Sequence, residues 1–490
     1  MKNYILVIDE GTTGVRALLF DRAMKIVASE YQNLQLYYPG PEQVEMDAKE
    51  VFNATVAVCR KVVGNHGISA EEIECVGTTY QRATWLFWDK TTGEPLRNAV
   101  TWQDGRGIHH KQKLVEDKDF DKKFPGLAPY LPGNWIMMNL YGVEEDEPEF
   151  KKAIAGENVL FGCMESYIGW RLTNGAVHAT TRSSAGSTGV YVAAEDRWNT
   201  EALEFFGVRK EILPELREES GEFGMMSADI LGIELPIYSS FADQQSAMFA
   251  QNCHKADTGK CTLGTGAFMD FNIGDVFGEV PGTYTAITWQ INGKKNYLVE
   301  GLSNTAGACL EWAKDQFKLF EKFEDMEEMA TSVEDNGGVY FIPALAGIMD
   351  DSSAKGAYLG IRPHVTNQHM MRATLEGVAF GALLLMETIA KHGKGLKEIS
   401  ISGGVAKSSL VAQILANVTD AKIVRPKSVE ATALGAAEAA AIRAGWMTME
   451  DVKDYLDIDK VYEPDKNAAA YKKTFENWKK AAERTLKWDI

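Results

Sequence analysis

Cysteine is scarce in this chain, with 6 among 490 residues, and none of them forms a Cys-x-x-Cys pair. Disulfide frameworks occur mainly in short secreted chains that are dense in cysteine. Isolated cysteines in so long a chain instead indicate reduced, mostly buried thiols. We therefore expect a protein of a reducing compartment.

Basic residues are also few, because 51 Lys and Arg stand against 69 Asp and Glu, a formal net charge of −18. A nucleic-acid-binding protein needs a basic face to meet the phosphate backbone, so this balance argues against nucleic acid as a partner. It does not exclude small phosphate ligands. Backbone N–H groups, one or two cations and a metal ion are enough to hold them.

Long hydrophobic runs are missing as well. The apolar run 4–8 ends at Asp9, which is too short for the hydrophobic segment of a signal peptide. No stretch approaches the roughly 20 apolar residues that a membrane helix needs. We therefore expect no membrane span and a cytoplasmic location.

The composition that is present is typical of a folded soluble protein. Apolar residues make up 45% and charged residues 24%, and a prior of roughly 150 residues per domain suggests two to four domains. Both halves contain a strand, a Gly-Thr turn and a returning strand, at 4–20 and at 260–271. This self-similarity indicates duplicated domains. We place the boundary just before Asp243, which gives domains 1–239 and 240–490.

Local patterns predict further helices and strands. A helix is expected from Asp47, which has the capping-box spacing to Glu50. Its expected apolar face holds Phe52, Val56, Cys59 and Val63. The other expected elements are strands within 75–102, a helix over 370–392, a strand over 397–402 and an alanine-rich helix over 432–444.

Three glycine-containing turns, each after a predicted strand, are candidates for phosphate binding. They are Asp9 to Thr13, Gly264 to Gly266, and Gly403-Gly404. The first offers backbone N–H groups and two hydroxyls, and an acidic residue at its edge can hold a hydrated Mg²⁺. Each turn alone fits a plain hairpin or helix start equally well. The usual P-loop and dinucleotide motifs are missing.

Two other positions could carry chemistry. Asp243, between an apolar stretch and an apolar helix, can accept a hydroxyl proton or serve as a helix N-cap. The pair His109-His110 fits a solvated pair better than a metal site, because no metal-binding motif accompanies it.

Taken together, several segments resemble the FGGY carbohydrate kinases, and among these the glycerol kinases most closely. The segments are IDEGTTGVRALLFD at 8–21, TYQRATWLFWDKTTGEPLRNAVTWQDGR at 79–106, SFADQQSAMFAQ at 240–251, LGTGAFM at 263–269, GGVYFIPALAG at 337–347, SGGVAKSSL at 402–410 and EATALGAA at 430–437. The resemblance implies an α/β fold of two duplicated actin-like (ribonuclease-H-like) ATPase domains with an interdomain cleft.

The resemblance also assigns roles to residues. Asp243 would be the catalytic base and Asp9 would lie near Mg²⁺. The residues that would contact ATP or its transferred phosphate are Thr12, Thr13, Gly14, Arg16, Gly264, Thr265, Gly307, Glu311, Gly404 and Ser408. The residues that would line the substrate pocket are Arg82, Ala83, Trp102, Tyr130, Asp243 and Gln244.

The chain departs from the glycerol-kinase pattern at several positions. Ala83 stands where glycerol kinases have a Glu that binds substrate hydroxyls. Glu311 replaces a usual Gln and Ser408 a usual Asn, and the segment 402–421 is more similar to xylulose kinases.

We therefore predict an ATP- and Mg²⁺-dependent kinase of a small polyol or sugar, with glycerol as the best single substrate. The alternatives are a ketopentose, tetritol or other larger polyol as substrate, and a non-kinase actin-like ATPase sensor. A homodimer or a homotetramer is the expected assembly.

Overall fold

The computed structural model describes residues 2–124, 136–303, 305–349, 351–391, 395–427 and 430–488. The chain divides into two compact units. Unit 1 comprises Met1–Ala250, Ala286–Lys295 and Glu430–Tyr455, and unit 2 comprises Gln251–Thr285, Asn296–Val429 and Leu456–Ile490.

This division differs from the boundary at 239/240 that the sequence suggested. Strand β14 (Leu235–Ala242) runs across that point and pairs with β5 (Ile73–Tyr80), so residue 240 lies inside a strand of unit 1. Helix α10 (Asp243–Ala250), which follows directly, packs on α15 (Ala431–Arg443). Asp243 therefore belongs to unit 1 by its packing, although it begins the second half of the sequence.

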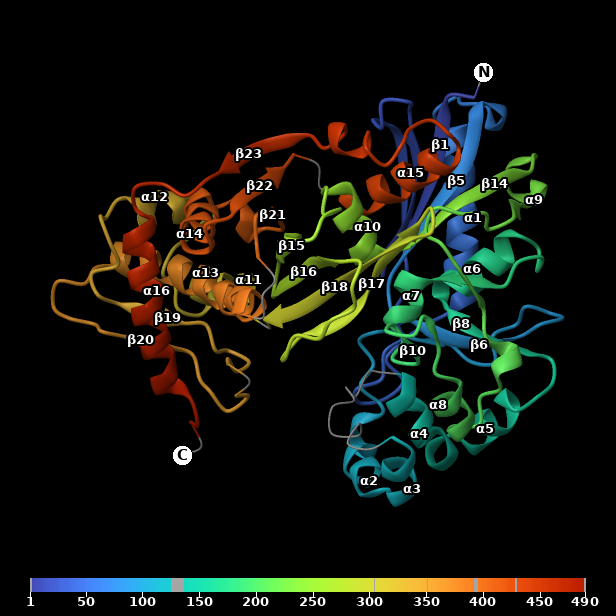
Figure 1. Ribbon diagram of the computed structural model, residues 1–490, viewed down its shortest axis with the longest axis horizontal. Helices are drawn as coiled ribbons and strands as arrows, with labels where there is room; N and C mark the ends of the chain where they lie inside the picture. Colours follow the sequence, from blue (N-terminus) through green and yellow to red (C-terminus); the bar gives the residue numbers. More distant parts are fainter. Residues whose placement is uncertain are drawn as a thin grey trace. The chain divides into compact units, whose positions relative to one another are not determined.

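Unit 1 is built on a six-stranded sheet with the order β13-β14-β5-β1-β2-β3 (Figure 1). The strands not yet given are β1 (Tyr4–Glu10), β2 (Gly14–Phe20), β3 (Ile26–Asn33) and β13 (Met225–Met226). Strands β1, β5 and β14 are parallel neighbours, and β2 returns antiparallel to β1. The predicted strand, turn and returning strand at 4–20 is confirmed.

Helices cover both faces of this sheet. Val76 belongs to the core that α1 (Ala48–Gly64) forms with the sheet. The next residue, Gly77, points to the other face, where a Cβ would lie 2.7 Å from the carbonyl oxygen of Ala436 on α15. Because successive residues of a strand point to opposite faces, α1 and α15 cover opposite sides. The small residues of α15 allow this close approach.

Helix α1 begins as predicted but buries a different face. The Asp47 side chain caps it by accepting from the backbone N–H groups of Lys49 and Glu50. The predicted apolar face was only partly right, since Phe52, Val56 and Val63 are half-buried. The fully buried hydrophobic residues are Ala48, Val51, Ala54, Val58, Cys59 and Val62. The half-buried side chains of Phe52, Val56 and Val63 pack at the rim of this neighbouring stripe.

A second part of unit 1 surrounds a four-stranded sheet of order β4-β7-β6-β8. Its strands are β4 (Glu45–Met46), β6 (Trp85–Asp89), β7 (Ala99–Val100) and β8 (Val159–Cys163). An aromatic core around Trp85, Phe87 and Phe161 joins this sheet to the helices that follow it. Those helices are η2 (Ile108–His110), α2 (Lys111–Glu116), α3 (Lys118–Lys123), α4 (Ile136–Asp146), α5 (Pro148–Ile154) and α8 (Thr200–Phe205).

The remaining elements of unit 1 are short. They are η1 (Ala70–Glu72), α6 (Met164–Leu172), β9 (Ala179–Thr181), α7 (Arg182–Gly186), β10 (Tyr191–Val192), β11 (Arg197–Trp198), η4 (Lys210–Ile212), β12 (Glu215–Arg217), α9 (Ala228–Leu231) and η6 (Val452–Asp454).

Unit 2 repeats the topology of unit 1. Its strands follow the order β18-β16-β15-β21-β22-β23. Strand β17 (Tyr284–Ile291) lies mostly within the residues of unit 1. Strand β15 is parallel to β21, which is parallel to β22, and β16 returns antiparallel to β15. The strands are β15 (Thr258–Leu263), β16 (Ala267–Gly274), β18 (Lys294–Ser303), β21 (Glu398–Ser402), β22 (Lys422–Pro426) and β23 (Ile458–Tyr462). The sheet of unit 1 has the same pattern around β1, so the predicted duplication is confirmed.

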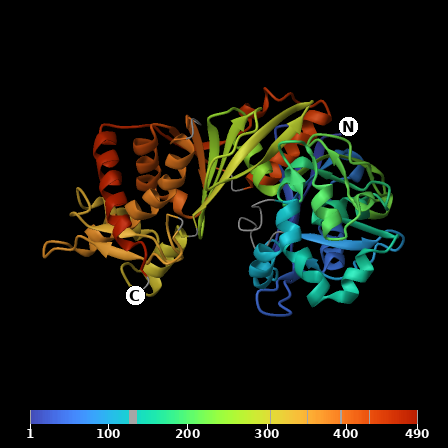
Figure 2. The same cartoon turned by 60° about the horizontal axis from the view of Figure 1, so that its bottom comes forward.

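The helices of unit 2 pack beside this sheet. Helices α13 (Asn367–Lys391), α14 (Ser409–Thr419) and α16 (Ala468–Ala482) lie side by side in both views (Figures 1 and 2). The other elements are α11 (Gly307–Asp315), α12 (Asp325–Thr331), β19 (Tyr340–Ile342), β20 (Ala357–Leu359), η5 (Val405–Lys407) and η7 (Glu483–Thr485).

Helix α13 is long and apolar enough to cross a membrane by length and composition alone. The expectation that no segment reaches this length and hydropathy was therefore wrong. Within the protein, however, 72% of the apolar window of α13 is buried. This burial is typical of the core helix of a globular domain, which passes the same test.

All six cysteines are free and buried, as the sequence predicted. Burial raises the pKa of the Cys59 and Cys261 thiols to about 12. Such thiols stay protonated at neutral pH and behave as small apolar side chains.

Candidate functional site

The topology of unit 1 brings the predicted catalytic residues to one edge of its sheet. In the strand register, Tyr80 at the end of β5 lies beside Glu10 of β1 on one side and Ala242 of β14 on the other. The carboxyl ends of parallel strands meet at the same edge. Three segments therefore lie side by side at this edge: the turn after Glu10, the loop after Tyr80, and the start of α10 at Asp243.

The turn between β1 and β2 is fixed by its glycines. The Gly11 backbone N–H donates to the Gly14 carbonyl oxygen at 3.0 Å. A Cβ on Gly14 would overlap the ring of Tyr31, whose hydroxyl donates to the carbonyl oxygen of Thr13 at 3.2 Å. Only glycine allows this packing. The turn predicted to contact phosphate thus packs against Tyr31 of β3.

The Thr12 hydroxyl links this turn to the two loops beside it. It donates to Gln81 Oε1 at 3.1 Å and accepts from the indole Nε1 of Trp102 at 2.9 Å. Trp102 is 39% exposed, so its ring is held at the surface of the site by this bond. The structure therefore brings together Thr12 and Trp102, which the sequence assigned to phosphate and substrate respectively.

Gln81 is the centre of a buried hydrogen-bond network that the sequence analysis did not identify. Its Nε2 donates to Glu10 Oε1 at 2.6 Å, and its Oε1 also accepts from the Thr84 hydroxyl at 3.0 Å. Burial raises the pKa of the Glu10 carboxyl to about 8, and the hydrogen bond from Gln81 opposes this rise. This shift favours the uncharged form of Glu10. The only signal in the sequence was a polar residue directly after a buried strand.

Asp9 is half-buried among charged side chains. It lies opposite Arg16 in the β1–β2 register, and Arg16 forms an ion pair with Glu430, which precedes α15. Burial raises the pKa of the Asp9 carboxyl to about 7, with Arg16 lowering it and Asp243 and Glu430 raising it further. Carboxylate oxygens are the ligands that Mg²⁺ prefers, and a divalent cation would relieve the repulsion among these carboxylates. The donor set fits Mg²⁺.

The orientation of the Asp243 carboxylate is fixed by its neighbours. Its Oδ1 accepts from the Gln244 backbone N–H at 2.7 Å, and its Oδ2 accepts from Gln244 Nε2 at 3.2 Å. The Arg82 guanidinium forms an ion pair with this carboxylate, with Arg82 Nε 3.7 Å from Asp243 Oδ1. Three of the residues predicted for catalysis and substrate binding, Arg82, Asp243 and Gln244, are thus brought together.

Ala83 follows Arg82 in a left-handed conformation, with φ of 55°. Alanine rarely adopts this conformation, which costs roughly 1–2 kcal/mol relative to an ordinary one. Strained residues of this kind cluster at functional sites. Tyr130, the remaining residue predicted for the substrate pocket, lies outside the described residues.

In unit 2, Gly264 and Gly307, both predicted for the nucleotide, lie in contact, and Gly403 packs against Leu263 directly before Gly264. A Cβ on Gly307, at the start of α11, would lie 2.5 Å from the Gly264 carbonyl oxygen, to which the Gly307 N–H donates at 2.8 Å. A Cβ on Gly403 would lie 2.6 Å from the Leu263 carbonyl carbon, and Gly403 has φ of 92°. These contacts leave no room for a side chain. We call Gly264, Gly307 and Gly403 the glycine cradle, because glycine is also the residue that lets a phosphate approach the backbone closely.

Three further nucleotide candidates lie around this cradle. Thr265 is exposed, and its carbonyl oxygen accepts from the backbone N–H groups of Ala306 and Ala308 at 2.9 and 3.1 Å. Glu311 is exposed one helical turn after Gly307. Gly404 is exposed with open space where its Cβ would be.

Ser408 has a structural function in addition to its predicted one. Its hydroxyl caps α14 by accepting from the Val411 N–H at 3.2 Å, and it donates to Glu327 of α12. The side chain is 9% exposed. A direct contact with a nucleotide would have to compete with these two bonds.

Comparison with known proteins identifies the family. Residues 4–250 match the N-terminal domain of the FGGY family of carbohydrate kinases, and residues 259–444 match its C-terminal domain. The glycerol kinase of Thermoanaerobacter sp. (strain X514) is 36% identical over 100% of this chain and 99% of that protein. The glycerol kinase of Acaryochloris marina (strain MBIC 11017) is 35% identical over 99% of both.

Solved structures share the fold over the full length. Plasmodium falciparum glycerol kinase, solved with ADP, superimposes with a TM-score of 0.92 at 25% identity, covering 99% of this chain and 98% of that one. A xylulose kinase from Lactobacillus acidophilus superimposes with a TM-score of 0.85 at 23% identity over 98% of both chains, which shows the fold alone. The duplicated topology of the two units and these matches together show that the chain belongs to the FGGY family of carbohydrate kinases.

Proposed function

We propose that this protein transfers the γ-phosphate of ATP to a hydroxyl of a small polyol, with glycerol as the first candidate. The observation that carries the proposal is the Asp243 carboxylate, fixed by Arg82 and Gln244 at the edge where β1, β5 and β14 end. Two relatives that match the whole chain at 35–36% identity are glycerol kinases.

Asp243 is the proposed general base. As the substrate oxygen forms its bond to the γ-phosphorus, a Asp243 carboxylate oxygen takes the hydroxyl proton, and the bond from the γ-phosphorus to the ADP oxygen breaks. Two hydrogen bonds from Gln244 hold the carboxylate in one orientation, so little reorganisation is needed when the proton moves. Arg82 supplies a positive charge and hydrogen-bond donors beside the same group.

The other charged and backbone groups suit the phosphate donor. Asp9 is the proposed residue for Mg²⁺, which would neutralise phosphate charge when bound. The turn from Gly11 to Thr13, together with Arg16, is proposed for the transferred phosphate. In unit 2, the cradle of Gly264, Gly307 and Gly403 is proposed for the nucleotide, with Thr265, Gly404, Glu311 and Ser408 around it. These functional assignments stay proposals, as does the division of substrate and nucleotide binding between the two halves of the chain.

Ala83 favours a second candidate, a kinase of a larger polyol or ketose. The Ala83 side chain is a methyl group beside Arg82, and it offers a substrate hydroxyl no hydrogen-bond acceptor. In the glycerol-kinase pattern a Glu at this position binds the substrate. A shorter side chain frees volume, which a tetritol or ketopentose could fill.

A substrate panel separates these possibilities. ADP release by the purified protein is measured with Mg²⁺-ATP alone and then with glycerol, erythritol, xylulose and gluconate. The proposal requires release that depends on an added polyol and is fastest with glycerol. Fastest release with a longer substrate supports the second candidate. Equal release with and without any acceptor would contradict a kinase and favour an ATPase sensor.

We further propose that the protein acts in the cytoplasm without a membrane span, and that it assembles as a homodimer or homotetramer. The reducing-compartment interpretation of its six free, buried thiols supports the location. Size-exclusion chromatography with light scattering tests the assembly.

A further inference from the structure

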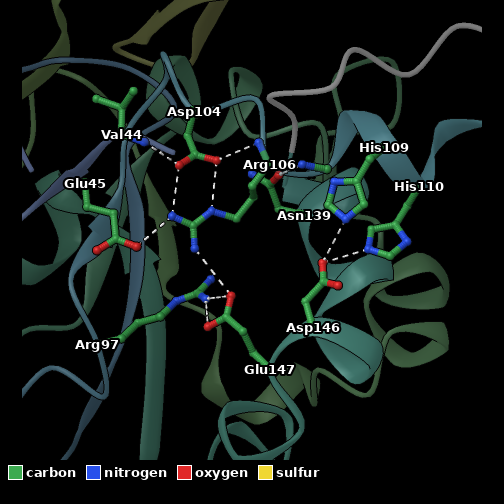
Figure 3. A network of polar contacts seen from close by, with 11 residues as sticks. Val44, Glu45, Arg97, Asp104, Arg106, His109, His110, Asn139, Asp146 and Glu147 are labelled. Atoms are coloured by element: carbon green, nitrogen blue, oxygen red, sulfur yellow. Dashed lines mark hydrogen bonds and ion pairs between the residues drawn. The ribbon is translucent and has the colours of Figure 1, made fainter. Parts of the chain in front are cut away.

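Two adjacent histidines and one aspartate of unit 1, none of them assigned to catalysis, lie close together. His109 and His110 end the short helix η2, and Asp146 ends α4. His109 Nε2 lies 3.1 Å from Asp146 Oδ2, and His110 Nε2 lies 2.7 Å from the same oxygen (Figure 3). Among the described residues, His109, His110 and Asp146 are the group that could hold a metal ion, because their ligand atoms all lie within 4.8 Å of one another.

We propose that His109, His110 and Asp146 form a binding site for a divalent transition-metal ion, with Zn²⁺ as the expected ion. Two imidazole nitrogens and one carboxylate oxygen are a common ligand set of Zn²⁺, completed by water or another ligand. Imidazole also suits Ni²⁺ and Cu²⁺, whereas Mg²⁺ prefers oxygen ligands. The site is therefore chemically distinct from the one proposed at Asp9.

The separations of the ligand atoms suit a tetrahedral ion. Metal–ligand bonds of 2.0–2.2 Å place the ligand atoms of such a site about 3.3 Å apart. The two observed nitrogen–oxygen distances are 3.1 and 2.7 Å. Shifts of about 0.6 Å or less in these side chains would open the group around an ion. The exposure of His109 and Asp146 leaves room for a fourth ligand from solvent.

Two glycines place the histidines against α4. A Cβ on Gly142 of α4 would lie 2.6 Å from His110 Nε2, so the imidazole packs where a side chain would otherwise stand. A Cβ on Gly107, just before η2, would lie 2.8 Å from the Met138 carbonyl carbon. The Gly107 N–H also donates to Asn139 Oδ1 at 3.1 Å. The absence of side chains at Gly107 and Gly142 thus lets the histidine pair pack directly against α4.

A charge network holds the two segments on either side of the cluster. Arg106 binds Asp104 through Nε at 2.9 Å and Glu45 at 2.7 Å, and it contacts Glu147 at 3.3 Å. Glu147, directly after Asp146, also pairs with Arg97 (Figure 3). Because Arg106 and Glu147 flank the two ligand-bearing segments, their ion pair fixes one segment relative to the other. A metal site with such supporting contacts needs little reorganisation on binding.

The alternative is a hydrogen-bonded cluster without metal, in which both imidazoles donate to one carboxylate. The exposed His109 distinguishes the two cases. Its side chain is 57% exposed and could be fully hydrated elsewhere, yet its ring lies 4.0 Å from the His110 ring, centroid to centroid, with both Nε2 atoms on Asp146. Other charged groups near the cluster have their own partners: Glu145 pairs with Lys113, and Asp117 accepts from Tyr141.

The test is a Zn²⁺ titration of the full chain without a histidine tag. Metal-free protein is titrated by calorimetry and by competition with a chromophoric chelator, in excess Mg²⁺ so that oxygen-ligand sites are filled. His109→Gln and Asp146→Asn are the test variants, since both residues are exposed and the changes are close in size. His66→Gln is the matched control, because His66 is also a surface histidine of unit 1 beside a carboxylate, with Nε2 3.5 Å from Glu30.

We expect wild type to bind one equivalent of Zn²⁺ with micromolar or tighter affinity. Each test variant should weaken binding at least tenfold, and His66→Gln should leave it unchanged. Zn²⁺ should also raise the thermal unfolding midpoint of wild type and of His66→Gln but not of the test variants. Substitution by Co²⁺ should give the visible spectrum of a tetrahedral site. The proposal is overturned if wild type binds no Zn²⁺ up to about 100 μM, or if the test variants bind as wild type does.

Discussion

Arg82 Nε lies 3.7 Å from Asp243 Oδ1, and this pair joins the loop after β5 to the start of α10. The two residues are far apart in sequence but follow neighbouring parallel strands. The pair places a guanidinium and a carboxylate together at the sheet edge where the turn after Glu10 also lies.

Replacing Asp243 by Asn should remove the base without removing the fold. Asn is isosteric and keeps an oxygen for the Gln244 N–H, so thermal unfolding should change little. The turnover number with the best substrate should fall by roughly two to four decades, the usual contribution of general-base catalysis. Exposed Asp454→Asn is the control and should turn over normally. Near-normal turnover of Asp243→Asn would exclude Asp243 as the base.

Asp9 should make the affinity for Mg²⁺ depend on pH. Its carboxyl, with a pKa of about 7, holds a proton below that pH, and Mg²⁺ must displace this proton to bind. The apparent Mg²⁺ dissociation constant should therefore rise about tenfold for each pH unit below 7 and level off above it. A direct Mg²⁺ or Mn²⁺ titration without nucleotide measures this. A constant affinity from pH 5 to 8 would contradict the assignment.

Asp9 should also lower stability as the pH rises. Its pKa is raised from an ordinary 3.8 to about 7 in the folded protein, so the folded state binds more protons than the unfolded state between these values. Stability from this group is therefore present at low pH and is lost as the pH rises through 7. Without metal, the free energy of unfolding of Asp9→Asn should exceed that of wild type by more at pH 8 than at pH 5. Chemical denaturation at both pH values checks this, with Asp454→Asn as the variant that should show no such difference.

A carboxylate at position 83 should improve the use of glycerol. A hydroxyl that gains a charged acceptor typically gains about 1.5–3 kcal/mol, or one to two decades of affinity. Ala83→Glu should thus lower the KM for glycerol and raise it for any larger substrate, whose space it would fill. Ala83→Gly is the control for the backbone, since glycine relieves the φ of 55° without adding an acceptor. Tight glycerol binding by wild type that Ala83→Glu does not improve would mean that another residue supplies the contact.

Gly307→Ala should weaken ATP binding in unit 2. The added Cβ would meet the Gly264 carbonyl oxygen at 2.5 Å, so the two turns must separate. We expect a loss of roughly 1–3 kcal/mol in stability from this overpacking, and at least a tenfold higher KM for ATP with little change in polyol KM. Gly64→Ala, at a position with open space, is the control and should affect neither. An unchanged KM for ATP would remove Gly307 from the nucleotide site.

Much of the fold could be predicted because its signals are local. The run 4–8, its glycine turn and the returning strand predicted β1 and β2, and Asp47 predicted the start of α1. The long helix predicted over 370–392 is α13, whose bounds are Asn367–Lys391. The face that α1 buries was predicted only partly, since neighbouring apolar stripes on one helix differ little and packing chooses between them.

The candidate site was predictable only where its residues lie in short motifs. Asp9 lies near the end of a buried strand, Arg82 and Asp243 follow buried strands, and the family resemblance assigned their roles. Glu430 was not identified, because its partner Arg16 is 414 positions away in the sequence. Gln81 was quoted only within a motif, and its bond to the buried Glu10 depends on the pairing of β1 with β5.

By itself, the sequence determined the family, the duplicated α/β architecture, and the turns and strand ends that carry the candidate catalytic residues. These depend on hydrophobic period, glycine positions and short motifs, all of which are local. The tertiary structure alone decided that Asp146 meets His109 and His110, and that the Ser408 hydroxyl binds Glu327. It also decided that residues 240–250 pack in unit 1. Contacts of this kind depend on how separate helices and strands pack, and no local pattern encodes which distant side chain will fill a given space.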